Sequence, residues 1–564
     1  MLHPPDAVYN QYIPEMKYFL LFTSILVLPA CSGDRPGDAA KPNLLFIMMD
    51  DFGYGDFGPN NATLTVDDFN PWFIRLVKEN QDYSPEQALA FSKSATPTLN
   101  SLAAEGILFA NAYTSSNLCA PSRLGIATGM HQNRMGVYRN VDCEQRGLDP
   151  GSHLARVIQG MGYATAHIGK WHIGQRDRSI IERLADSLGL DLELDRWGNL
   201  RDNPEVYRAF MNSGYLGSVI DEHNPLQNGF DYYYGYNYWA SQFYNSTLVW
   251  ENYTHAGKQK GYNTDVFTDK ALDFIRSAVE RDKPFYVQLH YHAVHDSLEP
   301  KAPDRYYDQF TSPSYDLNNF YAHVNAVDTN VKRILDYLSS KGRLENTLII
   351  FTSDNGGQVG GPSVLPGNAP FSGQKGSYLL GGMRVPFFCY WPAGIREAKR
   401  LDHLVSTMDI IPTMIDAAGG RVPDAIDGKS LLPLITGKND EAIHEYLVWT
   451  GIHSRYWGFM RESIIEPSAR ERARAPFAWA VVKNGYILRH VGRIVPGLYK
   501  DLPYGADPST RLFRITDDPA ETADLSEEMP ELLKSMREIY NKESAGLPPP
   551  YSVSIEQWKA LSAY

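Results

Sequence analysis

Cysteine is scarce in this chain of 564 residues, which contains only four. So few cysteines exclude a disulfide-stapled scaffold, which needs several bridges in a short chain. No cluster of cysteine and histidine has the spacing of a zinc site. Two of the cysteines, Cys143 and Cys389, either pair with each other or remain buried thiols. The chemistry of the other two, Cys31 and Cys119, depends on the residues around them.

The chain also has fewer positive than negative residues: 53 Lys and Arg against 66 Asp and Glu, for a net charge of −13. Proteins that bind nucleic acid generally carry basic patches, so we expect no nucleic-acid partner. A few clustered lysines and arginines still suffice to bind an anionic substrate in a local pocket.

Long apolar runs are rare, and the one at residues 18–28 is too short to span a membrane. It follows Lys17 and precedes Pro29-Ala30-Cys31, which is the pattern of a bacterial lipoprotein signal. We expect residues 1–15 to be a mis-called start or an untranslated lead. We expect an exported bacterial protein, periplasmic or on the outer membrane or cell surface, with a lipid anchor at Cys31. A plain signal peptide with an incidental cysteine is the alternative.

Short apolar runs alternate with amphipathic patterns along the first part of the chain. The runs are suited to buried parallel strands and occupy residues 43–49, 163–169, 284–292 and 346–353. Helical patterns occupy residues 96–106, 264–280 and 320–342. Strands that alternate with helices predict an α/β fold with a large, mostly parallel sheet and helices on both faces.

A smaller C-terminal region has a different pattern. Residues 445–451, 477–491 and 510–518 alternate like antiparallel strands, and residues 530–543 form a helical pattern. We therefore expect an N-terminal lead and signal segment at 1–40, a catalytic domain at 41–438, and an α+β subdomain with an antiparallel sheet and a tail at 439–564.

Polar side chains follow all four predicted strands of the large sheet. They are Asp50 and Asp51, Lys170 and His172, His295, and Asp354 and Asn355. Ligands of open α/β sheets bind at the carboxyl ends of the strands. Each group alone is explained by a turn or a cap. Together, their oxygen donors favour a site for a hard divalent cation such as Ca²⁺.

Basic side chains in the same regions provide a site for an oxyanion. Arg123, Lys170, His172 and Lys375 are the candidates, and Lys375 lies in a glycine-rich stretch that permits close approach of the backbone. His295 is a candidate general acid for a leaving alcohol. The alternatives are exposed lysines and a structural histidine.

Cys119 lies in the stretch NLCAPSRLGIATGMHQNR, at residues 117–134. A lone cysteine in a stiff, basic turn suggests chemistry. CAPSR at 119–123 resembles the maturation signature of the sulfatases, and ATG at 127–129 resembles its usual continuation. DDFGYGDFG, TPTLNSLAAEGILFANAYT, GKWHIG, TSDNGG and GGMRVP resemble further sulfatase motifs in the family's order. LFRITDDPAETADLSEEMPEL resembles the family's C-terminal signature, so the resemblance extends from about residue 41 to 540.

The resemblance implies an alkaline phosphatase-like fold and a specific chemistry. A maturation enzyme would convert Cys119 to formylglycine, whose hydrate attacks sulfur with one hydroxyl and expels sulfate through the other. Arg123 would orient this diol, Lys170 and Lys375 would neutralise sulfate oxygens, His172 would assist release of sulfate, and His295 would protonate the leaving oxygen. The implied Ca²⁺ ligands are Asp50, Asp51, Cys119, Asp354 and Asn355.

The expected substrate is a sulfated carbohydrate, such as an oligosaccharide from an algal polysaccharide like ulvan or from a glycosaminoglycan. This expectation comes from the predicted export and from the aromatic run at residues 229–244, whose rings are suited to stacking on sugars. One alternative is a phosphate or phosphonate monoester hydrolase of the same superfamily. The other is an inactive surface lipoprotein that binds carbohydrate.

Overall fold

The computed structural model describes residues 41–552 except 72–73, 75–77, 79–81, 191–201, 360–364, 453–476 and 492–508. The chain divides into one unit at Met1–Ala40 and another at Lys41–Tyr564. The predicted export segment and Cys31 lie outside the described residues. Among the helices that the structure describes, none is long and apolar enough to cross a membrane.

A ten-stranded sheet forms the centre of the second unit, in the order β11-β2-β10-β9-β1-β8-β4-β5-β6-β7. The four predicted strands are β1, β4, β8 and β9, and they lie side by side and parallel. The strands are β1 Asn43–Met49, β2 Ile107–Phe109, β4 Ala164–Lys170, β5 Tyr232–Tyr236, β6 Trp250–Glu251, β7 Thr254–His255, β8 Phe285–His290, β9 Thr347–Ser353, β10 Phe387–Tyr390 and β11 Lys399–Leu401. The predicted α/β class is confirmed, with antiparallel pairings of β10 on one side of the sheet and of β6 and β7 on the other.

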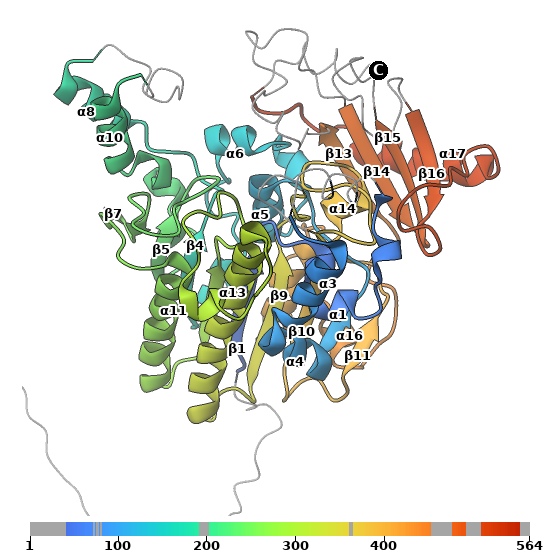
Figure 1. Ribbon diagram of the computed structural model, residues 1–564, viewed down its shortest axis with the longest axis horizontal. Coiled ribbons are helices and arrows are strands. Elements are labelled where there is room, and N and C mark those ends of the chain that lie inside the picture. The colour runs from blue at the N-terminus through green and yellow to red at the C-terminus, as the bar shows by residue number, and fades with distance from the viewer. Residues whose placement is uncertain are drawn as a thin grey trace, which may run out of the picture. The chain divides into compact units, whose positions relative to one another are not determined.

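Helices cover both faces of this sheet. Alternate residues of β1 explain why, since Leu45 and Ile47 belong to one apolar core and Leu44 and Phe46 to the other. Figure 1 shows α4, α11 and α13 side by side over one face. The helices are α1 Gly58–Asn61, α3 Pro85–Ser94, α4 Pro97–Glu105, α5 Cys119–Thr128, α6 Asn140–Arg146, α7 Ala155–Gly160, α8 Ser179–Leu188, α10 Pro204–Asn212, α11 Asn263–Glu280, α12 Asp304–Tyr307, α13 Tyr315–Ser340, α14 Leu380–Met383, α15 Ile410–Ala417, α16 Leu432–Ile435 and α17 Pro530–Ser544.

The register of the parallel strands aligns their carboxyl ends. Met49 at the end of β1 pairs with Ser353 at the end of β9, and Met48 pairs with His290 at the end of β8. Gly169 of β4 also pairs with His290. The polar residues that follow these strands therefore emerge at one edge of the sheet, as the sequence predicts.

The C-terminal region forms a second, antiparallel sheet of β13 Leu447–Ile452, β14 Phe477–Lys483, β15 Tyr486–Val491 and β16 Ser509–Arg514. Helix α17 packs against β14 of this sheet (Figure 1). The predicted strand at 477–491 is a hairpin, because Asn484 and Gly485 both take positive φ angles of 50° and 77°. These angles suit the tight turn that matches the twist of paired strands.

Cys143 and Cys389 are free, buried thiols, which settles the choice between pairing and packing. Cys143 lies in α6 and Cys389 lies in β10. Burial raises the pKa of both thiols far above the ordinary value, so both stay protonated and inert at neutral pH.

Candidate functional site

Cys119 is the first residue of helix α5, and local sequence explains where this helix begins and ends. Leu118 before it is extended, and Pro121 is tolerated in the first turn because that turn needs no backbone N–H donor. Gly129 ends the helix with a φ of +64°, a left-handed conformation that glycine adopts without strain. The CAPSR and ATG motifs thus fix both ends of a fully buried helix, with Cys119 at its positive pole.

Acidic and amide groups from two neighbouring strands surround this cysteine. Asp51 follows β1, and its Oδ1 accepts a hydrogen bond from Nδ2 of Asn355, which follows β9, at 2.7 Å. The Sγ atom of Cys119 lies 4.0 Å from the same Oδ1. The backbone N–H of Asp51 donates to Oδ1 of Asp354 at 3.2 Å. Asp51 also has a φ of +61°, a strained conformation that is typical of functional sites.

The donor set fits a hard divalent cation. One ligand atom from each of Asp50, Asp51, Cys119 and His295 lies within 4.8 Å of the others, and all four residues are buried. Oδ1 of Asp50 and Oδ1 of Asn355 are buried without a hydrogen-bond partner among the described residues. Buried oxygens without partners are costly, and an ion would satisfy them.

Three basic residues compensate the carboxylates. Nζ of Lys170 lies 2.6 Å from Oδ2 of Asp50, and Nζ of Lys375 lies 2.6 Å from Oδ2 of Asp51. Arg123 donates from Nε to Oδ2 of Asp354 at 3.0 Å. Burial raises the pKa of Asp50, but the charges of Lys170, His295 and Arg123 outweigh this effect and lower it to about 2. Asp50 is therefore ionised, and the neighbouring cations balance its charge.

His295 lies at the opposite side of Asp51 from Asn355. Its Nε2 is 3.6 Å from Oδ2 of Asp51, and its Nδ1 is 2.6 Å from the backbone oxygen of Asp296. Burial and Lys375 lower the pKa of His295, but Asp51 and Asp50 raise it to a net value of about 10. His295 therefore carries a proton at neutral pH, as a general acid requires.

An exposed indole adjoins this histidine. The ring of Trp239 lies 5.8 Å from the ring of His295, and the Trp239 backbone oxygen accepts a hydrogen bond from Nζ of Lys170 at 2.7 Å. Trp239 is 40% exposed, whereas Tyr233, Tyr236 and Tyr238 of the same aromatic run are buried. Most of the run at 229–244 is thus core, and Trp239 is its exposed ring at the site.

His172 lies beside the cluster, two residues after Lys170, and bonds a residue that the motifs do not indicate. Its Nε2 is 3.1 Å from Oε1 of Glu144, whose Oε2 accepts from Nη2 of Arg176 at 2.6 Å. The structure therefore brings all the predicted site residues to the carboxyl edge of the sheet and adds Glu144, Arg176 and Trp239. No sequence signal identifies Glu144, since 28 residues separate it from His172.

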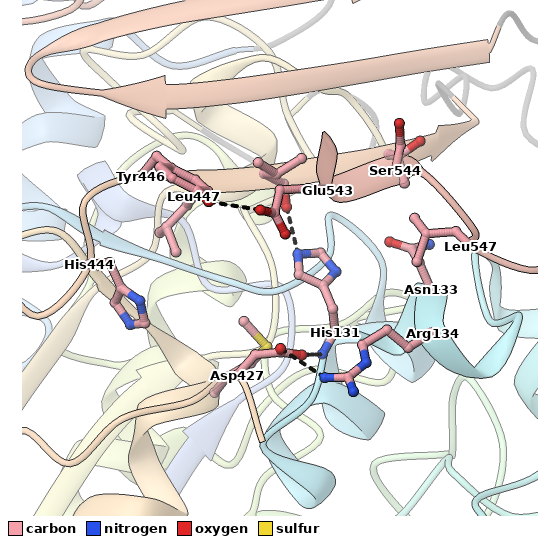
Figure 2. Close-up of a pocket in the computed structure, with 13 residues that line it drawn as sticks. His131, Asn133, Arg134, Asp427, His444, Tyr446, Leu447, Glu543, Ser544 and Leu547 are labelled. Carbon is pink, nitrogen blue, oxygen red and sulfur yellow. Dashed lines mark hydrogen bonds and ion pairs between the residues drawn. The ribbon is translucent and has the colours of Figure 1, made fainter. Parts of the chain in front are cut away.

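A different cavity of about 160 Å³ lies between the end of α5 and the C-terminal sheet. Figure 2 shows His131 at its centre, with Asp427 and Glu543 on either side. His131 bonds the backbone oxygen of Val448 through Nε2 at 2.5 Å, and its backbone N–H donates to Asp427 at 2.7 Å. None of the predicted site residues lines this cavity, whose contacts join the C-terminal sheet to the large domain.

Two family models match the chain. The model described as sulfatase matches residues 42–420. The model described as N-sulphoglucosamine sulphohydrolase, C-terminal, matches residues 378–463. The first match contains every predicted site residue.

Individual proteins are similar over most of their length. The uncharacterized sulfatase YdeN of Escherichia coli K12 is 33% identical over 421 residues, which cover 74% of this chain and 70% of YdeN. The N-acetylgalactosamine-6-O-sulfatase of Bacteroides thetaiotaomicron is 25% identical over 575 residues, covering 92% of this chain and 97% of that protein. The crystal structure of Ps i-CgsB in complex with k-i-k-neocarrahexaose has a TM-score of 0.65 and 23% identity, and the match covers 90% of this chain and 94% of that one. This structural likeness shows the same fold.

Proposed function

This chain belongs to the sulfatase family of sulfuric ester hydrolases, and we propose that it removes sulfate from a sulfated carbohydrate by means of formylglycine and Ca²⁺. The observation that carries the proposal is the place of Cys119. It starts a buried helix and shares a compact cluster with Asp50, Asp51 and His295. An unmodified thiol would form a sulfated adduct with no easy exit, whereas hydrated formylglycine supplies a geminal diol that attacks sulfur and then expels sulfate.

The residues around position 119 have distinct roles in this proposal. Asp50, Asp51, Asp354 and Asn355, together with the group at position 119, would hold Ca²⁺, which polarises the sulfate ester when bound. Lys170 and Lys375 neutralise the sulfate oxygens, and Arg123 orients the group at position 119. His295 donates a proton to the leaving oxygen, since its Nε2 lies at the cluster, 3.6 Å from Oδ2 of Asp51.

Two observations support a carbohydrate as the leaving group. Relatives of the chain include N-acetylgalactosamine-6-sulfatases, and the Ps i-CgsB structure contains a neocarrahexaose. Trp239 places an exposed ring beside His295, the proposed acid for the leaving oxygen. A sugar whose oxygen reaches His295 would lie against this indole, and aromatic faces pack well on sugar rings.

Release of free sulfate tests the proposal. The protein is co-expressed with a formylglycine-generating enzyme and incubated with N-acetylgalactosamine 6-sulfate, carrageenan and ulvan oligosaccharides, and glycosaminoglycan disaccharides. We expect sulfate release from one class and none from the Cys119→Ala variant. Release of phosphate from phosphate monoesters at a higher kcat/KM would instead identify a phosphoryl hydrolase. Export and a lipid anchor at Cys31 stay predictions, because the sequence alone supports them.

A further inference from the structure

The carboxylate of Glu144 and the guanidinium of Arg176 form a chain of hydrogen bonds that ends at His172. Glu144 bonds His172 through Oε1 at 3.1 Å and Arg176 through Oε2 at 2.6 Å. The His172 side chain is fully buried, and those of Glu144 and Arg176 are 19% and 14% exposed. The three groups come from two segments, since Glu144 lies in α6 whereas His172 and Arg176 both follow β4. Their alignment is therefore a feature of the fold.

Arg176 is held by more than its ion pair. Its guanidinium lies 4.1 Å from the ring centroid of Tyr238 in a cation–π contact, and the ring of Tyr238 lies 5.1 Å from that of Trp239. Burial raises the pKa of Glu144, but Arg176 and His172 outweigh this and lower it. Glu144 therefore remains ionised and can only accept hydrogen bonds.

The ionised partner decides where the proton of His172 resides. Burial lowers the pKa of His172 to about 4, in spite of its bond to Glu144, so the ring is neutral at neutral pH. Because Glu144 only accepts, the single ring proton must lie on Nε2. Nδ1 is then an unprotonated acceptor, and it is buried without a hydrogen-bond partner among the described residues. The backbone holds the ring there with a strained φ of +57°.

We propose that Glu144, held by Arg176, is a positioning residue that fixes His172 as the Nε2–H tautomer. The sulfatase resemblance implies that His172 assists release of sulfate, and in this tautomer Nδ1 is the ring nitrogen that can accept the proton lost from the hydroxyl group at position 119. This inference rests on the proposed function. In the step it serves, the O–H bond breaks and its proton moves to Nδ1, while the electron pair on oxygen forms the aldehyde C=O and the C–O bond to the departing sulfate breaks. Helix α6, which contains Glu144, also contacts the residue after Cys119, since Oδ1 of Asn140 accepts a hydrogen bond from the Ala120 N–H at 3.1 Å.

Glu144→Gln tests the tautomer directly. Arg176 donates to Oε2, so the glutamine amide must turn its oxygen to Arg176 and its NH₂ group to His172. An NH₂ donor requires an acceptor at Nε2, which moves the ring proton to Nδ1. Nitrogen NMR of ¹⁵N-histidine-labelled Cys119→Ala protein, with His172 assigned by His172→Gln, reads this proton without catalysis. We expect Nε2–H in the parent and Nδ1–H in Glu144→Gln. Nδ1–H in the parent, or the same tautomer in both proteins, would overturn the proposal.

Kinetics of the mature enzyme give the second test, on whichever substrate releases sulfate from the wild type. We expect Glu144→Gln to lower kcat about 100-fold or more, with KM changed less than about threefold, because Glu144 does not touch the substrate. Asp149→Asn is the control, since it removes an ion pair of similar length but greater exposure, to Arg146 at 2.7 Å, without touching His172. Adding Arg176→Met to Glu144→Gln frees the amide to rotate and should restore at least tenfold of the lost kcat.

The outcomes separate this inference from the proposed function. Sulfate release by the wild type, together with Glu144→Gln activity within twofold of it, refutes the role of Glu144 alone. A kcat loss that Arg176→Met does not relieve would also count against it, since amide orientation would not be the cause. The NMR result stands even where no sulfate is released, because it uses the Cys119→Ala protein, which needs no formylglycine.

Discussion

Arg123 contacts Oδ2 of Asp354 through two nitrogens of its guanidinium. Nε lies 3.0 Å from this oxygen, and Nη2 lies 2.9 Å from it. A third nitrogen, Nη1, donates to the backbone oxygen of Lys170 at 2.9 Å. One side chain thus joins α5, the end of β9 and the end of β4. Both partners of the ion pair are buried, so water could not compensate either charge if the other were removed.

Arg123→Lys should therefore be a damaging change. Lysine retains the charge but lacks the planar fork that makes these bonds. We expect the free energy of unfolding to fall by about 1–3 kcal/mol and sulfate release to fall at least 100-fold. Arg134→Lys is the control, because Arg134 pairs with Asp427 at 2.8 Å at the surface and should lose less than about 1 kcal/mol. Equal losses in urea unfolding of the two variants would contradict this account.

Calcium should stabilise the protein. Ca²⁺ added to chelator-treated protein is expected to raise the thermal midpoint, since an ion that binds only the folded state at about 100 times its Kd adds about 2.7 kcal/mol. Asp50→Asn removes one charge from the site and should at least halve the rise, whereas Asp427→Asn at the surface should leave it intact. No rise in the wild type, measured by differential scanning fluorimetry, would count against a calcium site.

Acid should destabilise the fold through its buried histidines. Burial lowers the pKa of His153, His167 and His323 to about 3 each, whereas the value for an unfolded chain is about 6.5. Between these values the unfolded chain binds protons that the folded protein does not, so stability falls as pH drops below about 6.5. In His323 both ring nitrogens already have partners: Nδ1 bonds the Tyr262 hydroxyl at 2.6 Å, and Nε2 bonds the backbone oxygen of Leu298 at 3.0 Å.

Urea unfolding at pH 7.5 and 5.5 measures this effect. His323→Gln should reduce the loss of stability between the two pH values by about 1 kcal/mol. His403→Gln, at a less buried position, should keep the wild-type difference. An unchanged pH dependence in His323→Gln would show that His323 does not oppose protonation.

Trp239→Ala should weaken binding of the leaving group rather than the chemistry at sulfur. We expect kcat/KM for the preferred sugar sulfate to fall about 10- to 100-fold, mainly through KM, because a stacking surface beside His295 is lost. Tyr253→Ala removes a similarly exposed ring, 43% against 40%, and should leave both parameters unchanged. An unaltered KM in Trp239→Ala would assign the sugar to another surface.

Sequence patterns predicted the centre of the large sheet and the gathering of the candidate residues at one of its edges, because both depend on local order. Asp50, Lys170 and Asp354 each lie at or next to the end of an apolar run, and parallel strands bring such ends together. The helix predicted at 320–342 begins earlier, at Tyr315, because Ser314 caps it by accepting from the Leu317 N–H. Apolar periodicity does not register such a cap.

Sequence patterns did not predict contacts between segments that lie far apart in the chain. Glu144 meets His172 only because α6 packs against α5 near the end of β4, and the sequence around Glu144 has no distinctive spacing. In the aromatic run, composition does not separate buried rings from exposed ones, so Trp239 is distinguished only by its 40% exposure. The short strands β11, at one edge of the sheet, and β2 beside it have three residues each and are too brief for periodicity to reveal.

The mass of the peptide that contains Cys119 tests the central claim most directly. The protein would be produced with a formylglycine-generating enzyme, digested, and treated with an aldehyde-reactive hydrazide before mass spectrometry. The account predicts an aldehyde at position 119, in a fraction that rises in parallel with the specific rate of sulfate release across preparations. Sulfate release at full rate from protein whose Cys119 is entirely an unmodified thiol would contradict it.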